Sequence, residues 1–308
     1  MNLTKKTALT LTIMCLIPIA LAKPKRCNFS DLQGEYPAEV RYICEDLKAV
    51  KDALDNDKKF PYQIENRLLM YGPPGNGKTT VANEIAKETR AHLIGINGPE
   101  IVQEYIGTGA KEVKKLFTEA INYAEVHNRP VVIVIDEIDA FAEHVESEHR
   151  AEHKAILQEV WHMLDVIKDD PRLFFVALTN SEKLNETFRT RFGNNICKIT
   201  PPDAATRRAL LEKYLMDYTG KRWKKSMLDD LVNRTDNEKF SIRFLISFVK
   251  ALATQARHDY EGKITKTLVD EVFEEIKVKY YENWVTWGKR IVKENAREIG
   301  YVLVRATT

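Results

Sequence analysis

The residues best suited to chemistry form a glycine-rich run that ends in a lysine and a threonine. The run comprises Gly72, Pro73, Pro74, Gly75, Asn76, Gly77, Lys78 and Thr79. It follows a short apolar segment and leads into good helix formers, so its glycines can turn backbone N–H groups toward a phosphate at a helix N-terminus. The Lys78 ammonium can neutralise β- and γ-phosphates, and the Thr79 hydroxyl can ligate Mg²⁺. The run predicts a phosphate-binding loop, with Thr80 counted among its nucleotide contacts.

Two adjacent carboxylates follow a second apolar segment. Val131–Ile135 is uninterrupted apolar sequence, and Asp136 and Glu137 come directly after it. Ligands of open α/β sheets bind at the carboxyl ends of the strands, where such carboxylates need a cation or a proton. Asp136 is suited to hold Mg²⁺ through its water shell, and Glu137 to polarise an attacking water as general base. The two motifs together predict ATP and Mg²⁺ as cofactors.

Short apolar runs alternate with longer helical patterns and supply the framework for these motifs. The runs are Leu68–Tyr71, Leu93–Ile96, Val131–Ile135, Leu173–Leu178 and Ile196–Ile199. Apolar strands of this kind need cover on both faces, so we expect a five-stranded parallel sheet sandwiched by helices. An amphipathic helix is expected at Tyr36–Leu54, and from Pro201 onward the apolar spacing is helical throughout. The fold class is therefore α/β, a P-loop NTPase followed by a smaller all-helical lid domain.

The amino-acid composition restricts the classes of protein to which the chain can belong. The chain has 308 residues, of which 44% are hydrophobic and 30% charged, enough to bury a sizeable core. Its 47 basic and 45 acidic residues nearly balance, which gives no bulk electrostatic reason to bind nucleic acid. Cys15, Cys27, Cys44 and Cys197 lack the paired spacing of a zinc site.

The first residues form a separate unit with two open interpretations. Lys5 and Lys6 precede an uncharged run from Thr7 to Ala22, which has the shape of a secretory signal cleaved near Ala22. The alternative is an uncleaved membrane anchor, although the run is short for a span of roughly 20 residues. Basic residues after the run favour keeping the following domain in the cytosol in that case. The chain is then either exported or membrane-anchored with its ATPase domain in the cytosol.

These motifs resemble the AAA family of ATPases, in particular the branch of protein unfoldases and membrane-anchored AAA proteases. The resemblance begins at Phe29–Gly34, similar to the family's entry motif, and extends to about residue 285. It implies that Asp31 and Gly34 contact the nucleotide. The expected organisation is a signal peptide or anchor at 1–22, a linker and N-terminal helix at 23–60, the nucleotide-binding domain at 61–200, the helical lid at 201–285 and a C-terminal tail at 286–308.

The resemblance also implies roles for residues beyond the two motifs. Asn180, after the strand-like run Phe175–Thr179, matches the sensor that contacts the γ-phosphate and positions water. Arg189 and Arg191 match the arginine-finger segment, in which one subunit reaches its neighbour's ATP. The family more often separates these arginines by two residues, which leaves their division of labour open. Arg243 is either a phosphate contact from the lid or a surface residue.

A further segment resembles the family's substrate-gripping pore loop. Tyr105, Ile106 and Gly107 give an aromatic–aliphatic pair before glycine, an apolar surface for an extended polypeptide. The run His149–His153 formally matches a zinc-peptidase pattern but falls where an ordinary helix is expected, so we expect no protease in this chain.

The resemblance implies an ATP-hydrolysing motor that remodels or unfolds polypeptides as a ring of identical subunits, most often six. A separate protease or adaptor is a possible partner. The alternatives are an ATP-gated scaffold or assembly factor and, less favoured by the near-neutral charge, a DNA-acting ATPase similar to a clamp loader.

Overall fold

Five strands form one all-parallel sheet, in agreement with the five apolar runs. A computed structural model describes residues 37–58, 64–103, 107–142, 150–182, 184, 186–220, 223–236, 240–259 and 263–279. The strands are β1 (Arg67–Tyr71), β2 (His92–Asn97), β3 (Val131–Asp136), β4 (Leu173–Thr179) and β5 (Ile196–Lys198). Their order across the sheet is β2-β3-β4-β1-β5. Because β4 lies between β1 and β3, the segments that follow these three strands meet at one edge.

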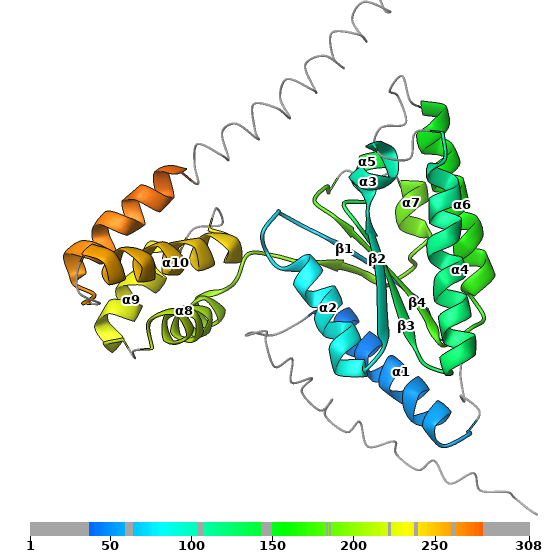
Figure 1. Cartoon of the computed structure of the whole chain (residues 1–308), viewed down its shortest axis with the longest axis horizontal. Coiled ribbons are helices and arrows are strands. Elements are labelled where there is room, and N and C mark those ends of the chain that lie inside the picture. The colour runs from blue at the N-terminus through cyan, green and yellow to red at the C-terminus, as the bar shows by residue number, and fades with distance from the viewer. Residues whose placement is uncertain are drawn as a thin grey trace, which may run out of the picture.

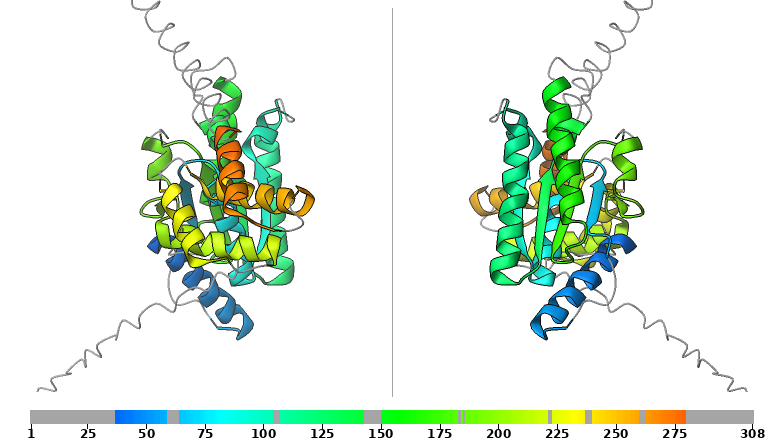
Figure 2. Two further views of the ribbon diagram at one scale, coloured as in Figure 1. Left: turned by 90° about the vertical axis from the view of Figure 1, so that its left-hand side faces the viewer. Right: turned by 90° about the vertical axis from the view of Figure 1, so that its right-hand side faces the viewer.

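Helices cover both faces of the sheet, as its apolar strands require (Figure 1). The helices that lie between the strands or precede them are α1 (Ala38–Asp55), α2 (Lys78–Thr89), α3 (Gly98–Gln103), α4 (Gly109–His127), α5 (Asp139–Ala142), α6 (Arg150–Ile167) and α7 (Glu186–Thr190). Helices α1 and α2 pack on one face, and α4 and α6 on the other, which the right-hand view of Figure 2 presents. Along β1, Leu68 and Met70 join the α1–α2 core, whereas Leu69 joins the opposite core. This alternation is the two-residue period of a strand buried on both sides.

After β5, every regular element among the described residues is a helix, as the change of periodicity at Pro201 predicts. It contains α8 (Ala204–Thr219), α9 (Lys225–Arg234), α10 (Ile242–Asp259) and a further helix at 266–279. The Asp203 side chain accepts a hydrogen bond of 2.7 Å from the Thr206 amide and caps the start of α8. Phe244, Phe248 and Phe273 lie in the core of this helical part, which the left-hand view of Figure 2 faces.

Arg207 ties this helical part together at its first helix. Its side chain is buried, and it donates to the Pro202 carbonyl at 3.0 Å and to Asp236 at 2.8 Å. Because Pro202 lies just before α8 and Asp236 just after α9, the guanidinium joins the entry segment to the second helix. A buried cation is stable when it is paired and hydrogen-bonded in this way.

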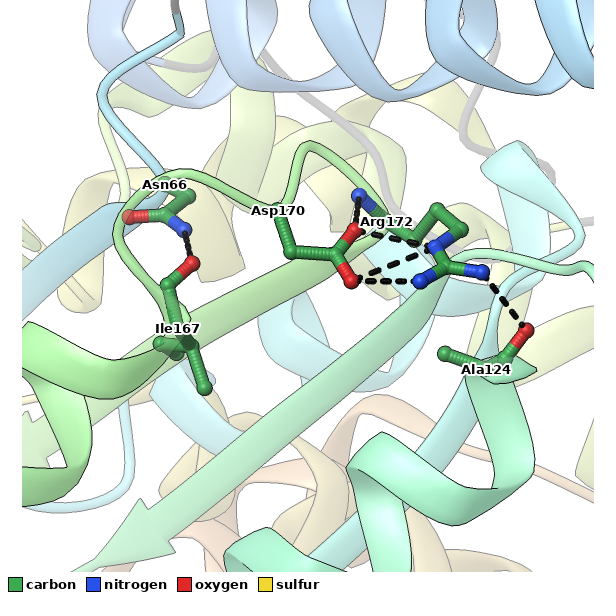
Figure 3. Close-up of polar contacts among 5 residues, drawn as sticks. All are labelled: Asn66, Ala124, Ile167, Asp170 and Arg172. Atoms are coloured by element: carbon green, nitrogen blue, oxygen red, sulfur yellow. Dashed lines mark hydrogen bonds and ion pairs between the residues drawn. The ribbon is translucent and has the colours of Figure 1, made fainter.

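The amino-terminal edge of the sheet, opposite the predicted motifs, is closed by two polar side chains (Figure 3). Arg172 makes a bidentate ion pair with Asp170, at 2.9 and 2.6 Å, and donates to the Ala124 carbonyl in the last turn of α4. Asn66 donates to the Ile167 carbonyl at the end of α6 at 2.8 Å. Both contacts satisfy carbonyl groups that a helix C-terminus leaves unpaired.

Several predicted features fall outside the described residues. They are the leader, the entry motif with Asp31 and Gly34, the pore-loop residues Tyr105 and Ile106, His149, and the tail from residue 286. Among the described segments, no helix combines the length and the apolar character needed to span a bilayer.

Candidate functional site

The glycine-rich run forms the turn between β1 and α2. Gly72 has a φ of 145°, and a Cβ at this position would lie 2.1 Å from the Ile199 carbonyl oxygen, so only glycine fits beside the residue that follows β5. Gly77 adopts a left-handed φ of 89° and leads directly into α2 at Lys78. No described side chain caps this helix N-terminus. The backbone therefore has the shape and polarity of an anion-binding turn.

Lys78 lies at the centre of this turn and is only 7% exposed. Its Nζ donates to the Gly72 carbonyl at 2.7 Å, to the Pro73 carbonyl at 3.1 Å and to Asn180 Oδ1 at 2.7 Å. An ammonium has three N–H donors, and these three acceptors use all of them. Burial lowers the pKa of Lys78 to about 8, although the nearby carboxylates of Asp136 and Asp139 act in the opposite direction.

Thr79 and Asp136 are brought together from α2 and β3. The Thr79 hydroxyl donates to Asp136 Oδ2 at 2.6 Å, and the Glu137 amide donates to Asp136 Oδ1 at 2.8 Å. Since the threonine proton is used in the contact with the carboxylate, the lone pairs of Thr79 Oγ1 are available to a cation. A hydroxyl and a carboxylate oxygen are the hard ligands that Mg²⁺ prefers.

Glu137 has an unusual backbone and a perturbed side chain. Its φ is 50°, in the left-handed region that non-glycine residues rarely adopt. Burial raises the pKa of the Glu137 carboxyl, and the negative charges of Asp136 and Asp139 raise it further. A carboxyl with a raised pKa beside a phosphate-binding turn is well placed to accept a proton from water.

Asn180 joins this cluster from the end of β4. Besides accepting from Lys78, it donates its backbone N–H to Asp139 Oδ1 at 3.4 Å. The contact of Asp139 with the end of β4 was not anticipated from the sequence, although Asp139 follows the acidic pair closely. Its position two residues after Glu137 was the available signal.

The two candidate finger arginines make their described contacts with residues outside this cluster. The Arg189 guanidinium lies over the Tyr71 ring at 5.3 Å, whereas that of Arg191 lies over Trp161 at 5.6 Å. Arg191 also approaches Asp165, with 3.8 Å between Nη1 and Oδ2. Within the contacts of the described residues, neither arginine joins the group around Lys78. Tyr71, Trp161 and Asp165 were not predicted, because nothing in the sequence links them to the arginines.

Arg243 meets the glycine-rich turn from the helical part. Its amide donates to the Gly75 carbonyl at 3.0 Å, and its side chain is exposed. A Cβ on Gly75 would lie 2.9 Å from Ser241 Oγ and 3.0 Å from Arg243 Cβ. The start of α10 therefore packs directly on the phosphate-binding turn.

Of the three pore-loop residues, Gly107 is described. It is exposed, with a φ of 75°, and its amide donates to Glu152 Oε1 of α6 at 2.5 Å. Nothing in the local sequence signals this contact, since 45 residues separate the two partners.

The fold and this site define a P-loop nucleotide-binding protein with a helical part that contacts the loop. Residues 68–198 match the sequence profile of the "ATPase family associated with various cellular activities (AAA)". The chain contains an AAA ATPase domain and belongs to this family.

Sequence similarity to individual proteins also supports the assignment to this family. The chain is 30% identical to cell division protein C of Sulfolobus acidocaldarius over 82% of this chain and 63% of that protein. It is 29% identical to a 26S proteasome regulatory subunit homolog of Methanocaldococcus jannaschii over 62% and 49% of the two chains. It is 31% identical to the ATP-dependent zinc metalloprotease FtsH 2 of Sphaerobacter thermophilus over 68% and 31%. The similarity thus spans 31% to 63% of the length of these relatives.

Proposed function

We propose that this chain is a Mg²⁺-dependent ATPase motor that remodels or unfolds polypeptides as a ring of identical subunits. The observation that carries the ATPase part is the meeting of three strand ends at one point. Lys78 donates a hydrogen bond to Asn180, and Thr79 donates one to Asp136. Residues from the segments after β1 and β4 and from the end of β3 thus form one polar cluster. This is the arrangement that nucleotide phosphates and a divalent cation need.

In the proposed reaction each side chain of the cluster has one role. Lys78 would neutralise the β- and γ-phosphates, while Thr79 and Asp136 would hold Mg²⁺, which would supply positive charge to balance that of the phosphates. Glu137 accepts a proton from the attacking water, and Asn180 orients that water against the γ-phosphate. The raised pKa of Glu137, caused first by burial, supports its role as the base.

We propose that the helical part changes position when nucleotide binds. Gly75 touches both Ser241 and Arg243, so a phosphate that moves the turn also moves the start of α10. The exposed Arg243 side chain is available as a phosphate contact from the lid. The proposed limits are 61–200 for the nucleotide-binding domain and 201–285 for the lid.

The ring is proposed because the described contacts of the finger arginines are with Tyr71, Trp161 and Asp165 and not with the cluster around Lys78. Phe188 and Phe192, each 2% exposed, anchor the segment that carries Arg189 and Arg191. In a ring, an arginine on this anchored segment would stabilise the transition-state charge at a neighbouring subunit's site. Arg191 is engaged by Trp161 and Asp165, and Arg189 by Tyr71, so either must release a contact to act in this way.

Polypeptide substrates are proposed from two lines of support. Tyr105 and Ile106 resemble a polypeptide-gripping pair, and the names of two relatives refer to a proteasome subunit and an ATP-dependent protease. A separate protease or adaptor is then a natural partner.

The decisive experiment compares Glu137→Gln with wild type. The amide keeps the shape of the side chain but cannot accept the proton, so we expect turnover to fall by roughly 10²- to 10⁴-fold with nucleotide affinity kept within a few-fold. Glu112→Gln is the matched control, because Glu112 lies on α4 in an exposed pair with Lys115. Turnover at the wild-type rate in Glu137→Gln would exclude Glu137 as the base.

A further inference from the structure

Gly98, the residue between β2 and the rest of α3, is pressed against the backbone of Glu137. A Cβ built on Gly98 would lie 2.4 Å from the Glu137 carbonyl oxygen, 3.1 Å from its carbonyl carbon and 3.2 Å from the Asp136 carbonyl oxygen. All three are backbone atoms, which cannot swing aside as the tip of a flexible side chain can. No side chain fits at position 98 unless Glu137 or α3 moves.

The Glu137 backbone is already fixed on its other sides. Its amide donates to Asp136 Oδ1 at 2.8 Å, and its carbonyl accepts from the Ala140 amide at 3.0 Å. The next amide, of Ile138, donates to the Leu178 carbonyl of β4 at 3.0 Å. These bonds hold Glu137 at its left-handed φ of 50°, a conformation that is unfavourable for a residue with a Cβ unless its surroundings support it.

Helix α3 has little freedom to retreat from this contact. Asn97, the last residue of β2, is in register with Asp136 on β3, which sets Gly98 beside Glu137. Three residues further, Ile101 is fully buried in the same core cluster as Ile138 and Phe141. A side chain at position 98 would therefore displace the Glu137 peptide or disturb this core.

We propose that Gly98 is a positioning residue for ATP hydrolysis: its missing side chain leaves the space that the left-handed Glu137 backbone occupies. The inference rests on the proposed role of Glu137 as general base. Gly98 touches the backbone of the base rather than nucleotide, so it acts on the chemical step and not on binding. Reacting groups displaced by about 1 Å lose up to roughly 10²-fold in rate.

The test is Gly98→Ala, with Gly95→Ala as the matched control. Gly95 lies on β2, three residues before Gly98, where a Cβ would meet Val134 at 3.3 Å or more, and it is exposed. We expect Gly98→Ala to lower kcat by roughly 10- to 100-fold, with the Kd of a fluorescent ATP analogue within about 3-fold of wild type. Gly95→Ala should stay within about 2-fold in both quantities, since its tightest contact, 3.3 Å to the Val134 carbonyl oxygen, needs a shift of only a few tenths of an ångström and lies away from Glu137.

A double variant separates positioning from general damage. If Gly98 acts through Glu137, then Gly98→Ala should add no further loss to Glu137→Gln, because the base is already absent. Two results would overturn the inference. One is a double variant in which the fold-losses in kcat of the two single variants multiply; the other is a kcat of Gly98→Ala within about 2-fold of wild type.

If Gly98→Ala is too unstable for a turnover assay, its thermal stability provides the test. In the double variant Gly98→Ala/Glu137→Gly, glycine at position 137 allows the backbone there to rotate away from the added Cβ. The double variant should therefore have a higher Tm than Gly98→Ala alone. If the double variant has no higher Tm than Gly98→Ala, the loss of stability does not come from the contact with the Glu137 backbone, and the inference is refuted. Wild-type turnover in Glu137→Gln would instead refute the proposed function, whatever Gly98→Ala does.

Discussion

Replacing Asp136 by Asn should remove the Mg²⁺ dependence of nucleotide binding, for a reason visible in the hydrogen bonds. The Glu137 amide can only donate, so it requires an oxygen at the Oδ1 position of residue 136. The new amide group must then face Thr79, whose hydroxyl now donates to Oδ2 at 2.6 Å. Thr79 Oγ1 would have to accept instead, and one lone pair proposed to face Mg²⁺ is lost together with the carboxylate charge.

The size of the effect follows from the charge removed. Two unit charges 4 Å apart interact by about 4 kcal/mol at the effective dielectric constant of a site near the protein surface. Water between the carboxylate and Mg²⁺ weakens this, so we take about 2 to 4 kcal/mol, which is a loss of roughly 30- to 700-fold in affinity.

The assay is titration of ATP with and without Mg²⁺, monitored by calorimetry. Wild type should bind ATP more tightly in the presence of Mg²⁺, and Asp136→Asn should bind it about equally in both conditions. Glu137→Gln is the control, because it lies one residue away and keeps the Asp136 carboxylate and its contact with Thr79.

One outcome refutes the reasoning directly. If Asp136→Asn retains the wild-type difference between the two titrations, Asp136 and Thr79 do not hold the cation. A loss of affinity that is equal with and without Mg²⁺ would show general damage to the turn.

Other predictions concern the lysine, the fingers and the pore loop. Burial lowers the pKa of Lys78 to about 8, whereas binding of phosphates needs the ammonium form. ATP affinity should therefore fall as pH rises above 8, by up to roughly tenfold per pH unit, which binding measurements from pH 7 to 9.5 will test. Lys78→Arg should abolish this pH dependence, since a guanidinium stays charged. Mixing Arg191→Ala subunits with Glu137→Gln subunits should restore part of the turnover; strictly additive rates at every protein concentration would argue for a self-contained site. Tyr105→Ala should remove stimulation of turnover by unfolded polypeptides and the unfolding of a fluorescent substrate, and retained unfolding would contradict the threading mechanism.

The sequence alone determined the sheet, the helical part and the two motifs, because these depend on local patterns. Apolar runs bounded by polar residues predicted all five strands to within one residue at each end, with Ile196–Ile199 ending one residue too late. The phosphate-binding turn was recognisable because its glycines are required by the backbone, as where Gly72 passes so close to Ile199 that no side chain fits. Residues of this kind are specified by type and spacing.

The tertiary structure decided which distant residues meet. The order β2-β3-β4-β1-β5, which no local pattern encodes, sets the end of β4 between the other two motifs and gives Asn180 to Lys78. The same order and register bring Gly98 against Glu137, although the two residues are far apart in the printed sequence. Such contacts depend on how strands pair and helices pack across the whole sheet. The local sequence therefore gives no sign that the Glu137 carbonyl oxygen lies where a side chain at position 98 would be.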